Sequence, residues 1–287
     1  MRLKKSLGQH LLKDERTLSR IIKAAGLAPG DPVLEIGPGA GALTHKLLSA
    51  GARVAAIEKD DRFAESLAAL CAANPALTLF VIHADALHAD LDAAAALVAG
   101  PGRGGLRVAA NLPYNVATPI ILRLLERPDL FADILVLIQD EVAKRLAAAA
   151  GDPARGSLSV HCQMRADVSL LFEVPPQAFT PPPRVMSRMV RLRPLPGGPP
   201  HQVDSLEVFD HIVRGGFEHR RKTCYNSIRF SLKSGACDSL VAPPRHLDFM
   251  NDLFRAAGLD TSTRPHCVTN AQWAALANAA AHLIHNK

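Results

Sequence analysis

The stretch that decides the fold is Val33-Leu-Glu-Ile36-Gly37-Pro38-Gly39-Ala40-Gly41. It begins as a short apolar run typical of a buried strand and ends in glycines, directly before a helical pattern at residues 42–51. Glycines at this place let the chain turn tightly and let a ligand approach the backbone at the helix N-terminus. The stretch therefore predicts a strand, a binding turn and a helix at the start of an α/β domain.

The same alternation of apolar runs and helical patterns continues toward the C-terminus. The expected strands are 53–58, 77–82, 106–110 and 133–139, and the expected helices are 62–73, 91–98 and 118–126. Helices at 141–150 and 157–165 and strands at 168–174 and 186–193 complete the pattern. Such a chain forms a doubly wound, mostly parallel, Rossmann-like sheet covered on both faces. Its ligand is expected at the carboxyl ends of the strands.

Prolines and glycines at residues 194–200 mark the expected domain boundary. Only helical patterns follow, at residues 206–217, 221–232, 246–256 and 270–283. The sequence thus predicts a ligand-binding α/β domain over residues 1–195, which includes a basic segment at 1–23, and a small all-α domain over residues 201–287. The single tryptophan, Trp273, falls on the last helix and is expected in its core.

The composition excludes several classes of protein. The 287 residues are 48% hydrophobic, and no apolar run is long enough to cross a membrane. The basic N-terminus is not followed by the apolar core of a secretory signal. Five cysteines without a C-x-x-C spacing indicate reduced structural thiols and neither disulfides nor a metal site. We therefore expect a cytoplasmic globular protein without a metal ion.

The net charge of +6 is concentrated at the two ends of the chain. Residues 1–23 carry +5, residues 24–187 carry −4 and residues 188–287 carry +5. Clustered Lys and Arg side chains gain affinity for polyanions because they release the counterions of phosphates. Two basic ends around an acidic body indicate a nucleic-acid surface, and a merely solvated surface is the simpler alternative.

Carboxylates lie at the ends of three successive expected strands. The pattern Gly37-x-Gly39-x-x-Ala42, with Glu58 21 residues after Gly37, also fits a dinucleotide site in which Glu58 would bind the ribose of NAD. Glu35 would be a poor neighbour for a pyrophosphate but can hold a cation. Asp85 can accept the adenine amino group, and a helix N-cap is its alternative role. Together these residues favour S-adenosylmethionine over NAD.

The fourth strand ends in Asn111-Leu112-Pro113-Tyr114, which by itself would be a turn. Beside a nucleoside pocket, the Asn111 amide oxygen and the Leu112 carbonyl, held extended by Pro113, can accept from both N–H bonds of an adenine amine. The nitrogen lone pair then faces a sulfonium methyl group, and Tyr114 offers a ring on which an extruded base stacks. The tetrad predicts amino methylation driven by orientation and electrostatics.

With these motifs the sequence resembles the KsgA (RsmA) family of small-subunit rRNA adenine dimethyltransferases over nearly its whole length. The blocks that carry the resemblance are Lys5 to Leu12, Leu34 to Gly39, Ile57-Glu58, Ala84-Asp-Ala86, Asn111 to Asn115, Gln139 to Leu146, Phe179 to Val185 and Phe217 to Thr223. The family implies a class I S-adenosylmethionine-dependent catalytic domain, an rRNA-binding helical domain, and the transfer of four methyl groups to two adjacent adenosines in a hairpin near the 3′ end of small-subunit rRNA.

The resemblance also implies roles for single residues. Phe179 would be a second aromatic wall for the base, with a hydrophobic anchor of its proline-rich loop as the alternative. Arg220, Arg221 and Lys222 would contact phosphates, and Lys4 and Lys5 would close over cofactor or RNA. The expected partner is the rRNA of an immature small subunit, and the enzyme is expected to be a monomer. The implied cofactor contacts are His10, Leu12, Gly37, Gly39, Glu58, Asp85 and Asn111.

Two departures and two alternatives accompany the resemblance. His10 stands where many relatives carry Asn, and Thr223-Cys-Tyr-Asn226 replaces the usual Leu and Arg content, which leaves the RNA footprint open. An Erm-type large-subunit rRNA methylase shares fold and chemistry, but usually has Ile in the tetrad and lacks the block at 217–223. A non-catalytic ribosome-assembly factor is the other alternative, which the complete set of cofactor residues disfavours.

Overall fold

The computed structural model describes residues 10–74, 77–99, 105–219, 221–233 and 246–285. The chain divides into two units: residues 1–143 with 166–196 form a sheet unit, and residues 144–165 with 197–287 form a helical unit. The last junction between the units, after residue 196, falls at the expected boundary. Residues 144–165, expected in the α/β domain, instead pack with the helices.

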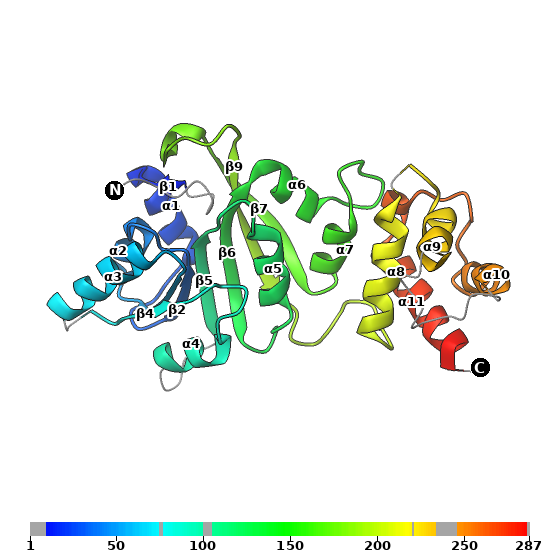
Figure 1. The fold of residues 1–287 in the computed structure, drawn as a ribbon, viewed down its shortest axis with the longest axis horizontal. Helices are drawn as coiled ribbons and strands as arrows, with labels where there is room; N and C mark the ends of the chain where they lie inside the picture. The colour runs from blue at the N-terminus through cyan, green and yellow to red at the C-terminus, as the bar shows by residue number, and fades with distance from the viewer. Residues whose placement is uncertain (1–9, 75–76, 100–104, 220, 234–245, 286–287) are drawn as a thin grey trace. The chain divides into compact units, whose positions relative to one another are not determined.

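The sheet unit contains a seven-stranded sheet of order β4-β3-β2-β5-β6-β9-β7 (Figure 1). Its parallel strands are β2 (Pro32–Ile36), β3 (Arg53–Glu58), β4 (Leu79–His83), β5 (Leu106–Asn111) and β6 (Phe131–Gln139). Strand β9 (Ser187–Pro194) pairs antiparallel with β6 and with β7 (Ala166–Val174). The chain runs outward from β2 to β4 and then returns to β5 on the other side of β2. This reversal confirms the doubly wound fold and opens a crevice at the carboxyl ends of β2 and β5.

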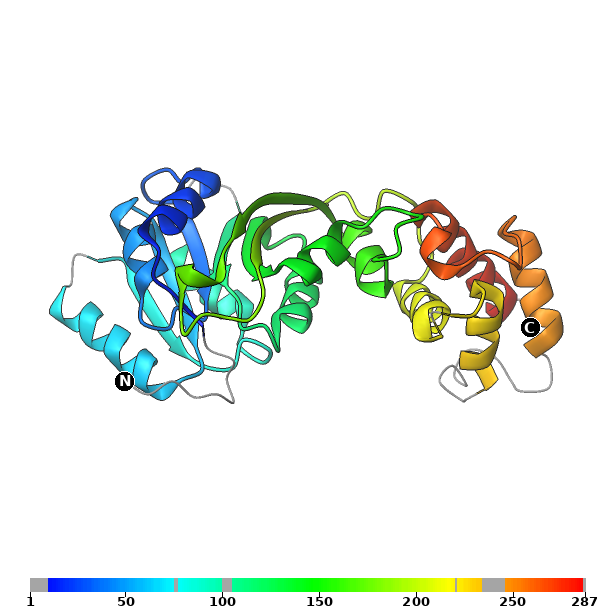
Figure 2. The same ribbon diagram turned by 90° about the horizontal axis from the view of Figure 1, so that it is seen from above.

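Helices cover both faces of this sheet, so alternate residues of the central strands are buried on either side. Helices α1 (Glu15–Ala25) and α2 (Ala42–Ser49) pack through Leu18, Ile21, Leu43 and Leu47 onto one core that includes Val33 and Ala109. Helices α4 (Leu91–Val98) and α5 (Ala117–Leu125) cover the other face (Figure 2). The unit also contains α3 (Asp61–Ala73) and the start of α6 (Asp140–Ala147).

The sequence did not reveal the structure of the N-terminal segment. Asp14 caps α1 by accepting from the Thr17 N–H at 2.7 Å, and Gly26 ends the helix with a φ of +56°. Before this helix, β1 (Leu11–Leu12) pairs antiparallel with β8 (Phe179–Thr180). The N-terminal segment is therefore tied to the proline-rich loop, which also contains a 3₁₀ turn at Pro176–Ala178.

The helical unit comprises α7 (Ser157–Gln163), α8 (Leu206–Glu218), α9 (Cys224–Lys233), α10 (His246–Ala256) and α11 (Asn270–His285), with a 3₁₀ turn at Pro265–Cys267. Helices α8 and α11 lie side by side (Figure 2). Trp273 is fully buried and packs so closely that a Cβ on Gly216 would lie 2.3 Å from its ring. The expectation that Trp273 belongs to the core is confirmed.

Buried Arg155 explains why residues 144–165 belong to the helical unit. Its guanidinium donates to the Ala148 carbonyl at 2.6 Å, to Gln163 Oε1 at 2.9 Å and to Asn270 Oδ1 at 2.5 Å. Val160 and Met164 join the same core as Trp273. A buried guanidinium is tolerated only where such partners exist, so this network fixes the segment against α11.

Membrane-spanning helices, metal-ligating clusters and cysteine pairing can be described only for the ranges given above. Within those ranges no helix is long and apolar enough to cross a membrane, and no group of three metal-ligating side chains occurs. Cys71, Cys162, Cys224 and Cys267 are free thiols, and Cys237 lies outside the described residues. Burial raises the pKa of the Cys162 thiol to about 12, so this thiol stays protonated.

Candidate active site

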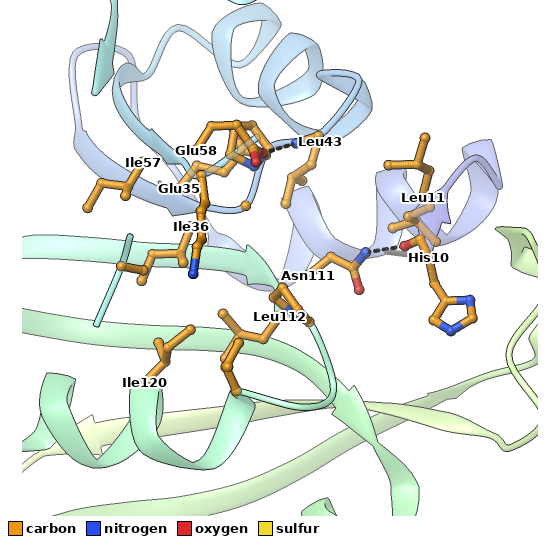
Figure 3. A pocket seen from close by; sticks show the side chains of 18 of the residues that line it. His10, Leu11, Glu35, Ile36, Leu43, Ile57, Glu58, Asn111, Leu112 and Ile120 are labelled. Carbon is orange, nitrogen blue, oxygen red and sulfur yellow. Dashed lines mark hydrogen bonds between the residues drawn. The ribbon is translucent and has the colours of Figure 1, made fainter. Parts of the chain in front are cut away.

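A pocket lies at the carboxyl ends of β2, β3 and β5 (Figure 3). The glycine turn, the tetrad after β5 and the N-terminal segment all contribute to its wall. The structure thus brings together every cofactor contact that the resemblance implied, along with three further tetrad residues. The predicted residues that line it are His10, Leu12, Gly37, Gly39, Glu58, Asp85, Asn111, Leu112, Pro113 and Tyr114.

The glycine turn requires its glycines. Gly37 and Gly39 have φ values of +68° and +54°, a region that costs other residues energy. A Cβ on Gly39 would also lie 2.7 Å from Leu11 Cδ2. Glu58 is 5% exposed and holds the turn, because Oε2 accepts from the Gly39 N–H at 2.9 Å and Oε1 accepts from the Asp60 N–H at 2.8 Å. A carboxylate has about four acceptor positions, so Glu58 retains capacity for a ligand hydroxyl.

Glu35 is the buried carboxyl at the end of β2. It is 1% exposed, lines the pocket, and its Oε2 accepts no hydrogen bond from any residue that the structure describes. Burial raises its pKa to about 8, and the nearby charge of Glu58 acts in the same direction. A cationic ligand group in the pocket would lower this pKa and occupy the free oxygen.

Asp85 follows β4 and is held from two sides. The Lys59 ammonium lies 2.7 Å from Oδ2, and the Leu87 N–H donates to Oδ1 at 2.9 Å. These bonds, with Lys59 first, hold the pKa of Asp85 below its usual value. The alternative role as a helix N-cap is wrong, because a turn follows Asp85 and the next helix begins only at Leu91. Asp85 caps this turn, and its carboxylate lines the pocket. Lys59 was missed because a lone lysine after a strand carries no distinguishing signal.

Asn111 is fixed by the N-terminal segment. Its Nδ2 donates to the His10 carbonyl at 2.9 Å (Figure 3), which leaves Oδ1 without a donor among the described residues. The Leu112 N–H donates to the Leu137 carbonyl at 3.1 Å, so the backbone of the tetrad is anchored to β6. No described residue donates to the Leu112 carbonyl oxygen. Two acceptors, Oδ1 and this carbonyl, are therefore available beside the pocket.

Tyr114 is held by contacts at its hydroxyl and its ring. The hydroxyl lies 2.6 Å from Ser187 Oγ, and burial raises its pKa, so the phenol is neutral. The His10 ring stacks on it with a centroid distance of 5.3 Å and an interplanar angle of 29°. His10 Nδ1 lies 2.8 Å from the Pro181 carbonyl oxygen. Ser187 and Pro181 were missed because only the tertiary fold brings them to the tetrad.

The structure buries Phe179, the predicted second aromatic wall for the base. The side chain is 1% exposed, belongs to the core with Leu12 and Ala178, and is absent from the pocket wall. Its backbone pairs with Leu12 in β8. The alternative, a hydrophobic anchor of the proline-rich loop, describes its position. The ring that lies against Tyr114 is that of His10.

The predicted RNA contacts are only partly described. Lys4, Lys5 and Arg220 lie outside the described residues. Arg221 and Lys222 are exposed and lie just before α9, in the helical unit. The Lys222 Nζ lies 4.1 Å from the centroid of the Phe230 ring, a cation–π contact, and Phe230 is 49% exposed.

Comparisons with known proteins find relatives over most of the chain. The family model described as "Ribosomal RNA adenine dimethylase" matches residues 1–243. A Phenylobacterium zucineum protein named "Ribosomal RNA small subunit methyltransferase A" is 40% identical over 277 residues, with 96% of this chain and 87% of that protein covered. A Rhodospirillum rubrum protein of the same name is 41% identical, with 96% and 87% covered.

Two solved structures share the fold over more than nine tenths of the chain. A dimethyladenosine transferase from Plasmodium falciparum superposes with a TM-score of 0.72 at 26% identity and covers 93% of this chain and 96% of its own. The 23S rRNA methyltransferase ErmE gives a TM-score of 0.63 at 27% identity, with 94% and 98% covered.

Proposed function

The chain belongs to the ribosomal RNA adenine dimethylase family, and we propose that it dimethylates the N6 amines of two adjacent adenosines in a hairpin near the 3′ end of small-subunit rRNA. The proposal rests on the hydrogen bonding of the Asn111 side chain. Because Nδ2 is tied to the His10 carbonyl, the amide must present Oδ1 as an acceptor. An exocyclic amine offers two N–H donors, and Oδ1 with the Leu112 carbonyl supplies two acceptors.

These two hydrogen-bond acceptors are what the chain itself contributes to the reaction. An adenine amine is a weak nucleophile because its lone pair is delocalised into the ring. Two acceptors that bind both N–H bonds fix the amine and turn its lone pair toward the cofactor side of the pocket. Acceptors held in place before the substrate arrives need no reorganisation during the reaction. The neutral Tyr114 ring supports the base from one face.

The pocket fits S-adenosylmethionine, which supplies an activated sulfonium methyl group when bound. Glu58 retains acceptor positions for the ribose hydroxyls, and Asp85 for the adenine amino group. The glycine turn allows close approach at its backbone. Glu35 has a buried oxygen without a described donor, which suits the cationic methionyl part. His10 and Leu12 complete the wall.

We further assign separate roles to the two domains. The sheet unit would bind the cofactor and catalyse, and the helical unit would bind rRNA through cations that include Arg221 and Lys222. Lys4, Lys5 and Arg220 are proposed as further contacts to RNA. The substrate would be an immature small ribosomal subunit in the cytoplasm, and the enzyme would act as a monomer.

The test is methyl transfer from labelled S-adenosylmethionine to immature small subunits that lack the modification, with large subunits as the control, followed by mapping of the modified bases. Dimethyladenosine at an adjacent pair in small-subunit rRNA is the expected result. Label confined to the large subunit would contradict the proposal and indicate an Erm-type activity. Tight binding of subunits and cofactor without transfer would indicate an assembly factor.

A further inference from the structure

The ring of His10 covers one face of the Tyr114 ring, the ring on which the proposed reaction would stack the base. The two rings are stacked with their centroids 5.3 Å apart, which leaves no space for a base between them. The Tyr114 hydroxyl is bound to Ser187 at 2.6 Å, so the tyrosine ring is not free to swing away. A base that stacks on this face of Tyr114 must therefore change the position of the His10 side chain.

The backbone and the side chain of His10 are held by different contacts. The carbonyl accepts from Asn111 Nδ2, and the residues that follow are paired in β1 with β8, with the Lys13 N–H donating to the Ala178 carbonyl at 2.9 Å. The ring is held by the stack on Tyr114 and by the contact of Nδ1 with the Pro181 carbonyl at 2.8 Å. Rotation about the side-chain bonds breaks only the second pair of contacts.

From this division we propose that the His10 imidazole is a stand-in for the adenine that receives the methyl group: it stacks on Tyr114 until that adenine binds. The adenine then displaces the imidazole from Tyr114, while the His10 backbone continues to position Asn111. The inference rests on the proposed function. Before RNA binds, the stacked ring keeps Tyr114 covered and ordered. An entering adenine exchanges one aromatic stack for a larger one, so the displacement favours purine rings over groups that cannot stack. His10 is thus a positioning residue that also selects for the incoming base.

The direction in which His10→Ala changes kcat/KM distinguishes this proposal from a simpler role of the ring. If the His10 ring is a stand-in, His10→Ala removes a competitor of the base, and kcat/KM for immature small subunits rises about three- to tenfold at saturating S-adenosylmethionine. His10→Phe retains a stacking ring that the base must still displace, so kcat/KM should not rise in this variant. If the ring instead forms a wall that sandwiches the base, His10→Ala lowers kcat/KM.

His45→Ala is the matched control, because His45 is an exposed histidine of α2 that does not line the pocket. Its kcat/KM should equal that of the wild type. A rise in His10→Ala with no rise in His10→Phe supports the proposal, and a fall or an unchanged value in His10→Ala overturns it. Cofactor affinity, measured by calorimetry on the free proteins, sets the saturating concentration for each variant. Absence of adenine methylation by the wild type would instead defeat the proposed function.

Discussion

The pocket of the sheet unit and the exposed cations Arg221 and Lys222 of the helical unit are built in opposite ways. In the pocket, the ionisable groups are few. Glu35 and Glu58 are 1% and 5% exposed, and each lies at the end of a strand. On the helical unit, Arg221 and Lys222 are exposed, and Lys222 is held by one ring contact. A preorganised site loses much when one group is removed, whereas exposed cations act additively and weakly. The two regions should therefore respond to substitution on different scales.

The largest effect is expected at Asn111. Asn111→Ala removes the acceptor Oδ1 and the bond to the His10 carbonyl, so kcat for methyl transfer should fall by about 10²- to 10³-fold, the range for loss of one preorganised group. RNA affinity, measured by filter binding, should stay within about threefold because phosphate contacts dominate it. Asn74→Ala, which removes an exposed amide on the edge of α3, is the control. Unchanged turnover in Asn111→Ala would remove Asn111 from the reaction.

The same contrast explains what the sequence could predict. The strands, the glycine turn and the tetrad follow from periodicity and spacing, because a parallel sheet brings all strand ends to one edge. Burial of Phe179 and the stack of His10 on Tyr114 depend on the pairing of β1 with β8, residues about 170 positions apart in sequence. Residues 144–165 join the helical unit through Arg155 and Asn270, a long-range contact that no local pattern records.

The pH dependence of stability tests whether burial keeps the Glu35 carboxyl protonated. Its pKa is raised from 4.5 to about 8, so between these values the folded protein keeps a proton that the unfolded chain releases. Stability conferred by the protonated carboxyl is therefore full below pH 4.5 and is lost as pH rises through about 8, by about 1.4 kcal/mol per pH unit within the window.

Glu35→Gln removes this titration. The difference in unfolding free energy between wild type and variant, measured by urea denaturation without cofactor, should move in favour of the variant by about 1.4 kcal/mol from about pH 6 to about pH 7. Groups common to both proteins cancel in this difference. A constant difference across that range would show that Glu35 is not a protonated carboxyl in the free protein.

Alanine substitutions at Gly39 and Gly26 distinguish the cost of backbone strain from an effect on the shape of the pocket. Gly39→Ala meets Leu11 Cδ2, whereas Gly26→Ala, at nearly the same φ, meets nothing within 4 Å. Both should lose about 1–2 kcal/mol of stability because each forces a left-handed conformation on alanine. Only Gly39→Ala should also weaken binding of S-adenosylmethionine, by about tenfold, because its methyl group displaces the Leu11 side chain, which lines the pocket. Equal cofactor affinity in the two variants, measured by calorimetry, would show that the turn tolerates this contact.

The smallest effect is expected on the helical unit. Lys222→Gln should lower affinity for small-subunit rRNA only a few-fold and reduce the slope of log K against log salt by about one, because one phosphate contact is lost. Lys46→Gln is the matched control, since that lysine already pairs with Glu15 at 2.7 Å in the sheet unit. Phe230→Leu removes the ring beneath Lys222 but no charge, so the slope should not change. A slope unchanged in Lys222→Gln would show that this cation is only solvated, and the comparison with the pocket would then rest on Arg221.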